Sequence, residues 1–149
     1  MKPKTLITAV LLLFVAGGVV ALVVKEFRRI EPEAEADGTI VHFFHGEKQC
    51  ERCTNAKAYA EEAVRATFAE QLDDGRLKWR MVNYDQPQNR HFKEKYDLPV
   101  PMIMLVKIDG GELIASKGLF NTLLTADDKQ ACIDYVTEGV QEFLQENGG

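Results

Sequence analysis

The amino-acid sequence predicts an α/β domain built on a four-stranded mixed sheet, and three observations support this class. Four short segments have the β-branched, aromatic and aliphatic composition of strands. A helical repeat separates the first from the second, so these two strands must pair in parallel through a right-handed crossover. Asp109-Gly110-Gly111 is a hairpin signal, which makes the last two strands antiparallel. The expected order is β-α-β-α-β-β-α, with helices on both faces of the sheet.

The first half of the domain follows a clear pattern. Residues Thr39 to His45 predict a central strand, because β-branched and aromatic side chains predominate there. From Cys50 to Asp74, apolar residues recur at i, i+3 and i+4, which predicts one long helix. Gly75 is expected to end that helix.

The second half adds the remaining elements. The last helix is expected to start at the N-cap Thr125 and to bury Cys132, after a loop at Gly118 to Leu124. The other predicted elements are a strand at Leu77 to Tyr84, a short helix at Pro87 to Tyr96, and strands at Pro101 to Lys107 and Glu112 to Lys117.

The N-terminal region has a different composition from the domain, which we expect to occupy residues 38–149. A short tail, residues 1–5, precedes an uncharged apolar run at residues 6–24. At ~1.5 Å per residue this run is close to the ~30 Å thickness of the bilayer core, so we predict a transmembrane anchor. A cleaved signal peptide is the alternative. Residues 25–37 read as a juxtamembrane linker, and the short tail favours an extracytoplasmic domain.

Charge and cysteine content exclude some function classes. The formal net charge is −5, and the only basic run is Lys25 to Arg29, which argues against nucleic acid as a partner. Three cysteines are too few for a disulfide scaffold. Two of them form one Cys-x-x-C motif, a pattern that favours chemistry over stapling.

The motif Cys50-Glu51-Arg52-Cys53 lies at the predicted start of the long helix. A helix N-terminus carries about half a positive charge, which favours a thiolate over a thiol. Two cysteines three positions apart on a first turn can form a disulfide. Cys50 is then the exposed attacking thiolate, and Cys53, one turn in, is the resolving thiol.

The strand, the Cys-x-x-C at a helix start, and Val100-Pro101 before an apolar strand together resemble the thioredoxin-like superfamily. Residues 83–106 have the layout of a thioredoxin's middle segment. The stretch VHFFHGEKQCERC at residues 41–53 looks most like the nitrophenyl compound nitroreductase subunit ArsF family, which pairs an FHG turn with a Cys-x-x-C and often has an N-terminal anchor. The resemblance covers roughly residues 38–146 and implies a minimal thioredoxin-like fold.

The resemblance also implies roles for individual residues. Cys50 and Cys53 match the redox pair. Pro101 matches the cis-proline of the superfamily, which lies against the disulfide, and Val100-Pro101 would present backbone to an extended substrate. Gln49 stands where thioredoxins have a tryptophan, and Glu51-Arg52 replaces their Gly-Pro, which puts ordinary thioredoxin substrates in doubt.

Two histidines have both a functional and a structural interpretation. His42 falls where thioredoxins keep a buried acid, and a neutral imidazole there could accept the proton of Cys53. The alternative is a hydrogen-bonded histidine within the strand. His45 could help to stabilise the Cys50 thiolate or contact substrate, or it could be a loop residue with a solvent or backbone partner. Cys132 is expected to be an inert core cysteine.

The leading hypothesis is a membrane-anchored thiol–disulfide oxidoreductase or thiol electron-transfer subunit, an enzyme whose only redox group is the disulfide. No nucleotide-binding glycine motif is visible, so the expected partners are a protein disulfide and an electron-donor thiol protein. One alternative is copper or zinc bound by Cys50, Cys53 and His42 or His45, although a second pair of ligands at matching spacing is missing. A redox-inert scaffold is the other alternative.

Overall fold

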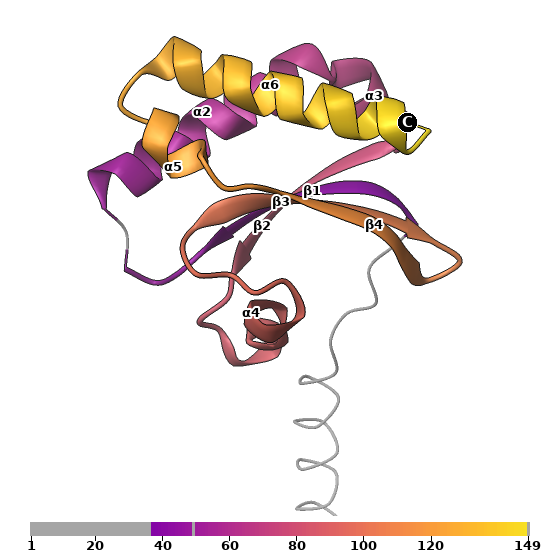
Figure 1. Ribbon diagram of the computed structural model, residues 1–149, viewed down its shortest axis with the longest axis horizontal. Coiled ribbons are helices and arrows are strands. Elements are labelled where there is room, and N and C mark those ends of the chain that lie inside the picture. Colours follow the sequence, from indigo (N-terminus) through magenta and orange to yellow (C-terminus); the bar gives the residue numbers. More distant parts are fainter. Residues whose placement is uncertain (1–36, 49, 149) are drawn as a thin grey trace, which may run out of the picture. The chain divides into compact units, whose positions relative to one another are not determined.

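The computed structural model of the chain describes residues 37–48 and 50–148 (Figure 1). The predicted tail at residues 1–5, the predicted anchor at residues 6–24 and linker residues 25–36 lie outside them. Within the described part of the chain, no helix combines the length and apolar character needed to cross a membrane.

The described chain contains alternating strands and helices. Its elements are β1 (Gly38–His45), α2 (Glu51–Thr67), α3 (Ala69–Asp73), β2 (Leu77–Asn83), η1 (Pro87–Asn89), α4 (His91–Lys95), β3 (Met102–Asp109), β4 (Glu112–Leu119), α5 (Thr122–Thr125) and α6 (Lys129–Glu146). The predicted order of strands and main helices is confirmed.

The four strands form one mixed sheet in the order β2-β1-β3-β4. β1 is parallel to β2 and antiparallel to β3, and β4 is antiparallel to β3. The parallel pair is joined through α2 and α3, as a crossover connection requires. Gly110 and Gly111 adopt positive φ angles of 60° and 79° at the turn between β3 and β4. The α/β class and the mixed sheet are therefore confirmed, and the topology is consistent with a thioredoxin-like fold.

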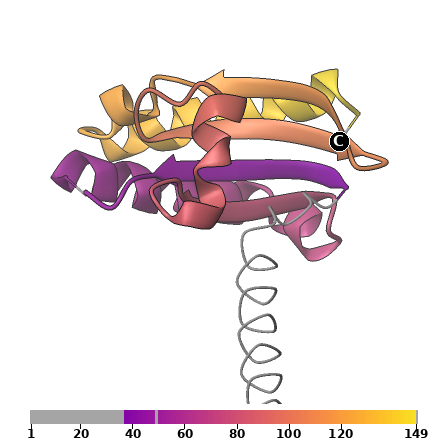
Figure 2. The same ribbon diagram turned by 90° about the horizontal axis from the view of Figure 1, so that it is seen from below.

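Helices cover both faces of the sheet (Figures 1 and 2). α2, α3, α5 and α6 lie on one face, and α4 lies on the other. Side chains of β1 alternate between these layers, because successive residues of a strand point to opposite faces. Val41 and Phe43 join the core beneath α2 and α6, whereas Ile40 and Phe44 join the core beside α4.

The predicted helix from Cys50 to Asp74 is divided into two in the structure. Phe68 leaves helical geometry, with φ −115° and ψ 30°, and separates α2 from α3. Its ring is buried in the core beneath α2, so the chain changes direction at a residue that is held by packing. Gly75 has a φ of 79°, in line with its predicted role at the end of the helical region.

The predicted N-cap of the last helix is wrong. α6 is capped by Asp128, whose carboxylate accepts a hydrogen bond from the Ala131 N–H at 3.1 Å. Thr125 instead ends α5, where its hydroxyl donates to the carbonyls of Asn121 and Thr122. An aspartate satisfies the free N–H groups of a first turn at least as well as a threonine does.

The two ends of the sheet carry different features. At one end, Asp37 precedes β1, and its carboxylate accepts a hydrogen bond from the Gly111 N–H at 2.9 Å. At the other end, Phe44 pairs with Met102, so the carboxyl end of β1 lies beside the amino end of β3. The loop that leads to the cysteine pair leaves from this second end.

Candidate active site

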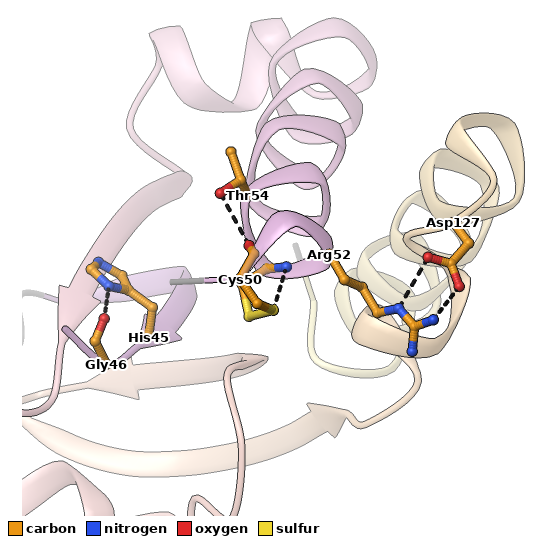
Figure 3. Close-up of a disulfide and its surroundings, with 7 residues drawn as sticks. His45, Gly46, Cys50, Arg52, Thr54 and Asp127 are labelled. Atoms are coloured by element: carbon orange, nitrogen blue, oxygen red, sulfur yellow. Dashed lines mark hydrogen bonds and ion pairs between the residues drawn. A yellow bond between two sulfur atoms is a disulfide. The ribbon is translucent and has the colours of Figure 1, made fainter. Parts of the chain in front are cut away.

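Cys50 and Cys53 are joined by a disulfide at the start of α2, with a Cα–Cα distance of 5.0 Å (Figure 3). The predicted pairing is therefore present in the structure. Cys50 is exposed, whereas Cys53 is only partly exposed. The pair thus has the asymmetry expected of an attacking and a resolving cysteine.

The sulfur of Cys50 lies at the N-terminus of a helix of 17 residues. Cys50 is the N-cap residue in an extended conformation, and its Sγ accepts a hydrogen bond from the Cys53 N–H at 3.2 Å. Its carbonyl accepts the Thr54 N–H at 3.0 Å, which closes the first helical turn. A donor aimed at Sγ and the positive end of the helix dipole both favour a thiolate at Cys50.

Arg52, between the two cysteines, is paired with the carboxylate of Asp127, which is far away in the sequence (Figure 3). Its Nε donates to Asp127 Oδ1 at 3.0 Å, and its terminal nitrogen donates to Asp127 Oδ2. Asp127 comes from the segment between α5 and α6, so the pair ties the first turn of α2 to that segment. An open depression beside the disulfide is lined by Cys50, Glu51, Arg52, Asn55 and Asp127.

His45 has a backbone partner, as one of its two interpretations expected. Its Nδ1 lies 3.0 Å from the carbonyl oxygen of Gly46, to which it donates as the Nδ1–H tautomer (Figure 3). This contact holds the ring against the loop backbone, and stabilisation of the Cys50 thiolate by His45 stays a prediction.

His42 is fully buried on the sheet face that α4 covers. Its ring stacks on Phe44 at a centroid distance of 5.2 Å and lies 5.9 Å from the ring of Phe92. α2 and the cysteine pair belong to the opposite face. The geometry therefore supports a packing role for His42 and gives no support to proton transfer from Cys53.

Val100 and Pro101 precede β3 at the end of the sheet from which the loop to Cys50 leaves. Val100 is exposed and Pro101 is half-buried. The expected cis peptide bond before Pro101 is not present, since every peptide bond of the described residues is trans. The preference for trans at X–Pro bonds, ~0.5–1 kcal/mol, agrees with this correction.

Cys132 belongs to α6, is part of the core on that side of the sheet, and is fully buried. Burial raises the pKa of its thiol, which keeps it protonated and unreactive. Across residues 37–48 and 50–148, no three His, Cys, Asp or Glu side chains are arranged to hold a metal ion.

Sequence reasoning missed two carboxylates near the site, Asp127 and Asp85. Asp127 contacts the residue between the cysteines, and Asp85 contacts the loop that precedes them. Each is far from its partner in the sequence, so no local spacing pattern could have revealed these contacts.

Among the solved structures that resemble this chain, two serve as examples. One is titled the structure of a malarial protein, with 22% identity, a TM-score of 0.38 and coverage of 62% of this chain and 97% of that chain. The other is a thioredoxin from Thermus thermophilus, with 16% identity, a TM-score of 0.37 and coverage of 68% and 79%. No family model and no curated protein matches the sequence. Similarity at this level carries no information about activity or substrates.

Proposed function

We propose that this chain is a thiol–disulfide oxidoreductase that reduces a disulfide of a partner protein. The observation that carries the proposal is the position of Cys50: the residue is exposed, and its sulfur caps α2 and accepts the Cys53 N–H at 3.2 Å. The half-buried Cys53 is already bonded to it. The same arrangement suits a thiol electron-transfer subunit of a reductase complex.

The reaction needs only the two cysteines of the reduced protein. The Cys50 thiolate attacks one sulfur of the partner disulfide, and the other partner sulfur leaves as a thiolate. Cys53 loses its proton to solvent and attacks Cys50 Sγ, which forms the Cys50–Cys53 disulfide and releases the second partner thiolate. Two electrons pass to the partner, and a donor thiol protein restores the dithiol.

The cellular setting of this activity rests on the sequence. The uncharged run at residues 6–24 supports an anchor in the membrane, with the domain on the extracytoplasmic side. The narrower resemblance of residues 41–53 to the ArsF family supports a role beside a reductase complex. Val100 and Pro101 are proposed to contact the substrate backbone, because they lie at the same end of the sheet as the loop to Cys50.

Trapping with matched cysteine variants tests the proposal. Cys53→Ser keeps the exposed sulfur and should accumulate a mixed disulfide with a model disulfide substrate. Cys50→Ser keeps the partly exposed Cys53 of the pair and should accumulate much less. Equal trapping by both variants, or none by either, would contradict the assigned roles.

A redox titration of the full chain then gives the direction of electron flow. A potential near about −270 mV indicates a reductant, and one near about −120 mV indicates an oxidant of incoming proteins. Metal content is measured on the same sample. Stoichiometric metal without a reversible disulfide would replace the proposed function by metal binding.

A further inference from the structure

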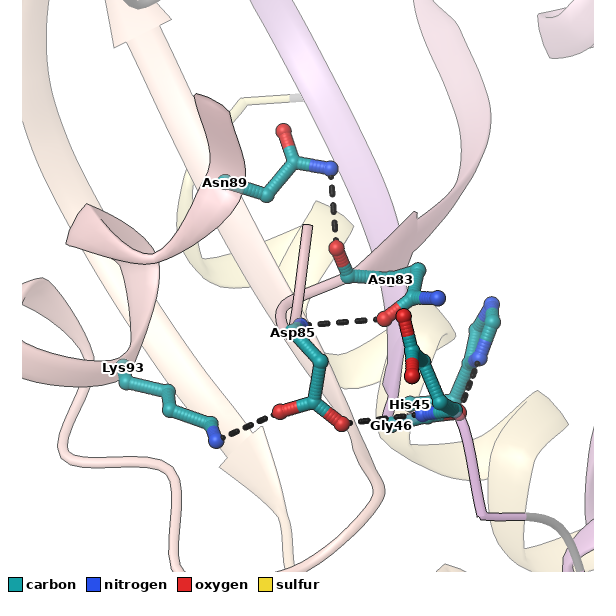
Figure 4. A network of polar contacts seen from close by, with 7 residues as sticks. His45, Gly46, Asn83, Asp85, Asn89 and Lys93 are labelled. Atoms are coloured by element: carbon teal, nitrogen blue, oxygen red, sulfur yellow. Dashed lines mark hydrogen bonds and ion pairs between the residues drawn. The ribbon is translucent and has the colours of Figure 1, made fainter. Parts of the chain in front are cut away.

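A polar network holds the loop between β1 and the disulfide (Figure 4). Asp85, which follows β2, accepts two hydrogen bonds through different oxygens. Oδ2 accepts the backbone N–H of Glu47 at 2.9 Å, and Oδ1 accepts Lys93 Nζ at 2.8 Å. One carboxylate therefore joins the loop, the end of β2 and helix α4.

The carboxylate is itself held in place by its surroundings. The backbone N–H of Asp85 donates to Asn83 Oδ1 at 3.0 Å, and the backbone carbonyl of Asn83 accepts a hydrogen bond from Asn89 Nδ2 at 2.9 Å (Figure 4). Tyr84, next to Asp85, donates its N–H to the His45 carbonyl at 3.0 Å, which continues the pairing of β1 with β2. Asp85 thus projects from a fixed strand end and is not part of a free loop.

The loop passes very close to this carboxylate. Gly46 is buried, and a Cβ placed there would lie 2.7 Å from Asp85 Oδ2 and 3.2 Å from the Tyr84 ring. Only glycine fits between these groups without a shift. The close approach shows that the backbone at residues 46 and 47 is fitted to Asp85, three residues before the sulfur that caps α2.

We propose that Asp85 is a positioning residue for Cys50: it fixes the loop so that the sulfur stays at the N-terminus of α2. This inference rests on the proposed function, because it assigns a control of the same thiol. Without the anchor the loop moves more freely, and the Cys50 thiolate spends less time in contact with the Cys53 N–H. A less stabilised thiolate makes the dithiol form less favourable and the pair more reducing.

The experiment compares three variants of the full chain in detergent. Asp85→Ala removes both hydrogen bonds. Asp85→Asn keeps an oxygen for the Glu47 N–H but loses the charge that pairs with Lys93. Asp109→Ala is the matched control, because it removes an exposed aspartate at the hairpin between β3 and β4, at the far end of the sheet.

Three readouts separate a positioning role from a merely structural one. Hydrogen exchange of the segment containing Glu47 should rise about two- to tenfold in Asp85→Ala, the effect of losing one hydrogen bond. Alkylation of reduced Cys50 at neutral pH should slow about threefold. The redox equilibrium should shift about threefold toward the disulfide, so the reduction potential of the pair becomes about 14 mV more negative. Asp85→Asn should lie between wild type and Asp85→Ala, and the control should match wild type.

Unchanged exchange at Glu47 in Asp85→Ala would overturn the anchor. Faster exchange with unchanged Cys50 alkylation would overturn its effect on the thiol. Failure of the proposed function looks different, since the wild-type chain would then show no reversible disulfide. Exchange and alkylation would still decide whether Asp85 positions Cys50.

Discussion

Replacing Asp127 by asparagine should raise the reduction potential of the Cys50–Cys53 pair by up to about 20 mV. In the structure the guanidinium of Arg52 is engaged by both oxygens of Asp127. Asparagine removes the negative charge, so the guanidinium becomes available to the Cys50 thiolate. The dithiol form is then better stabilised, and the pair becomes more oxidising.

Exposure limits the size of this effect. The side chains of Arg52 and Asp127 are 50% and 63% exposed, and ion pairs at such sites contribute about 0.2–1 kcal/mol. The guanidinium cannot give the thiolate more than a similar amount. Because ~1.4 kcal/mol corresponds to ~30 mV for two electrons, the upper bound of ~1 kcal/mol is about 20 mV.

Redox titration of each variant measures this shift in reduction potential. Arg52→Gln should shift the potential in the opposite direction, and Asp127→Asn should have little effect when Arg52 is already glutamine. Asp134→Asn is the matched control, since Asp134 is an exposed aspartate of α6 that accepts a hydrogen bond from Gln130. A lower potential in Asp127→Asn, or a full shift in the absence of Arg52, would refute the reasoning.

Three further predictions concern stability and reactivity. Gly139→Ala should destabilise the domain by about 1–2 kcal/mol in denaturant titration, because the cost of overpacking exceeds the gain in helix propensity. The added Cβ would lie 2.6 Å from Leu119 Cδ2. Unchanged stability would contradict this prediction and show that Leu119 can move. Hydrogen bonds from Lys93 and the loop N–H lower the pKa of Asp85 below its usual 3.8. The stability that the ionised carboxylate contributes is therefore complete above pH 3.8 and is lost as the pH falls through the lowered pKa. Acid titration should therefore unfold wild type more steeply than Asp85→Asn, and equal slopes would contradict this. Cys132 should resist iodoacetamide in the folded chain and react in denaturant, and rapid labelling of folded protein would show that it is not buried.

Local patterns in the sequence were sufficient for the sheet and for the cysteine pair. The hairpin between β3 and β4 was predictable because Asp109-Gly110-Gly111 is itself the turn, and both glycines adopt positive φ. The helix that carries the cysteines was predictable from its apolar repeat. Its interruption at Phe68 was not, because the residue keeps the spacing of the buried face and only tertiary packing reveals the change of direction.

The surroundings of the disulfide were harder to predict, for a physical reason. Because side chains alternate along β1, His42 lies on the other face of the strand from Val41 and Phe43. Both faces of this strand are buried and mainly apolar. The sequence therefore does not indicate which face receives α2. The carboxylates Asp127 and Asp85 contact residues 75 and 38 positions away, through side-chain geometry that leaves no periodic signal.

Cys50 thus lies between two contacts that originate far away in the chain, and these should act independently. Asp85 acts on the loop before Cys50 through a backbone hydrogen bond, whereas Asp127 acts on Arg52 after it through charge. The two carboxylates share no partner, so a chain with both Asp85→Ala and Asp127→Asn should show the sum of two opposite shifts, within the ~0.3–0.5 kcal/mol expected of independent sites. If the effect of Asp127→Asn disappears when Asp85 is alanine, Arg52 reaches the thiolate only when the loop is held. In that case the effects of the two carboxylates on Cys50 are coupled, and the separate roles assigned to them are wrong.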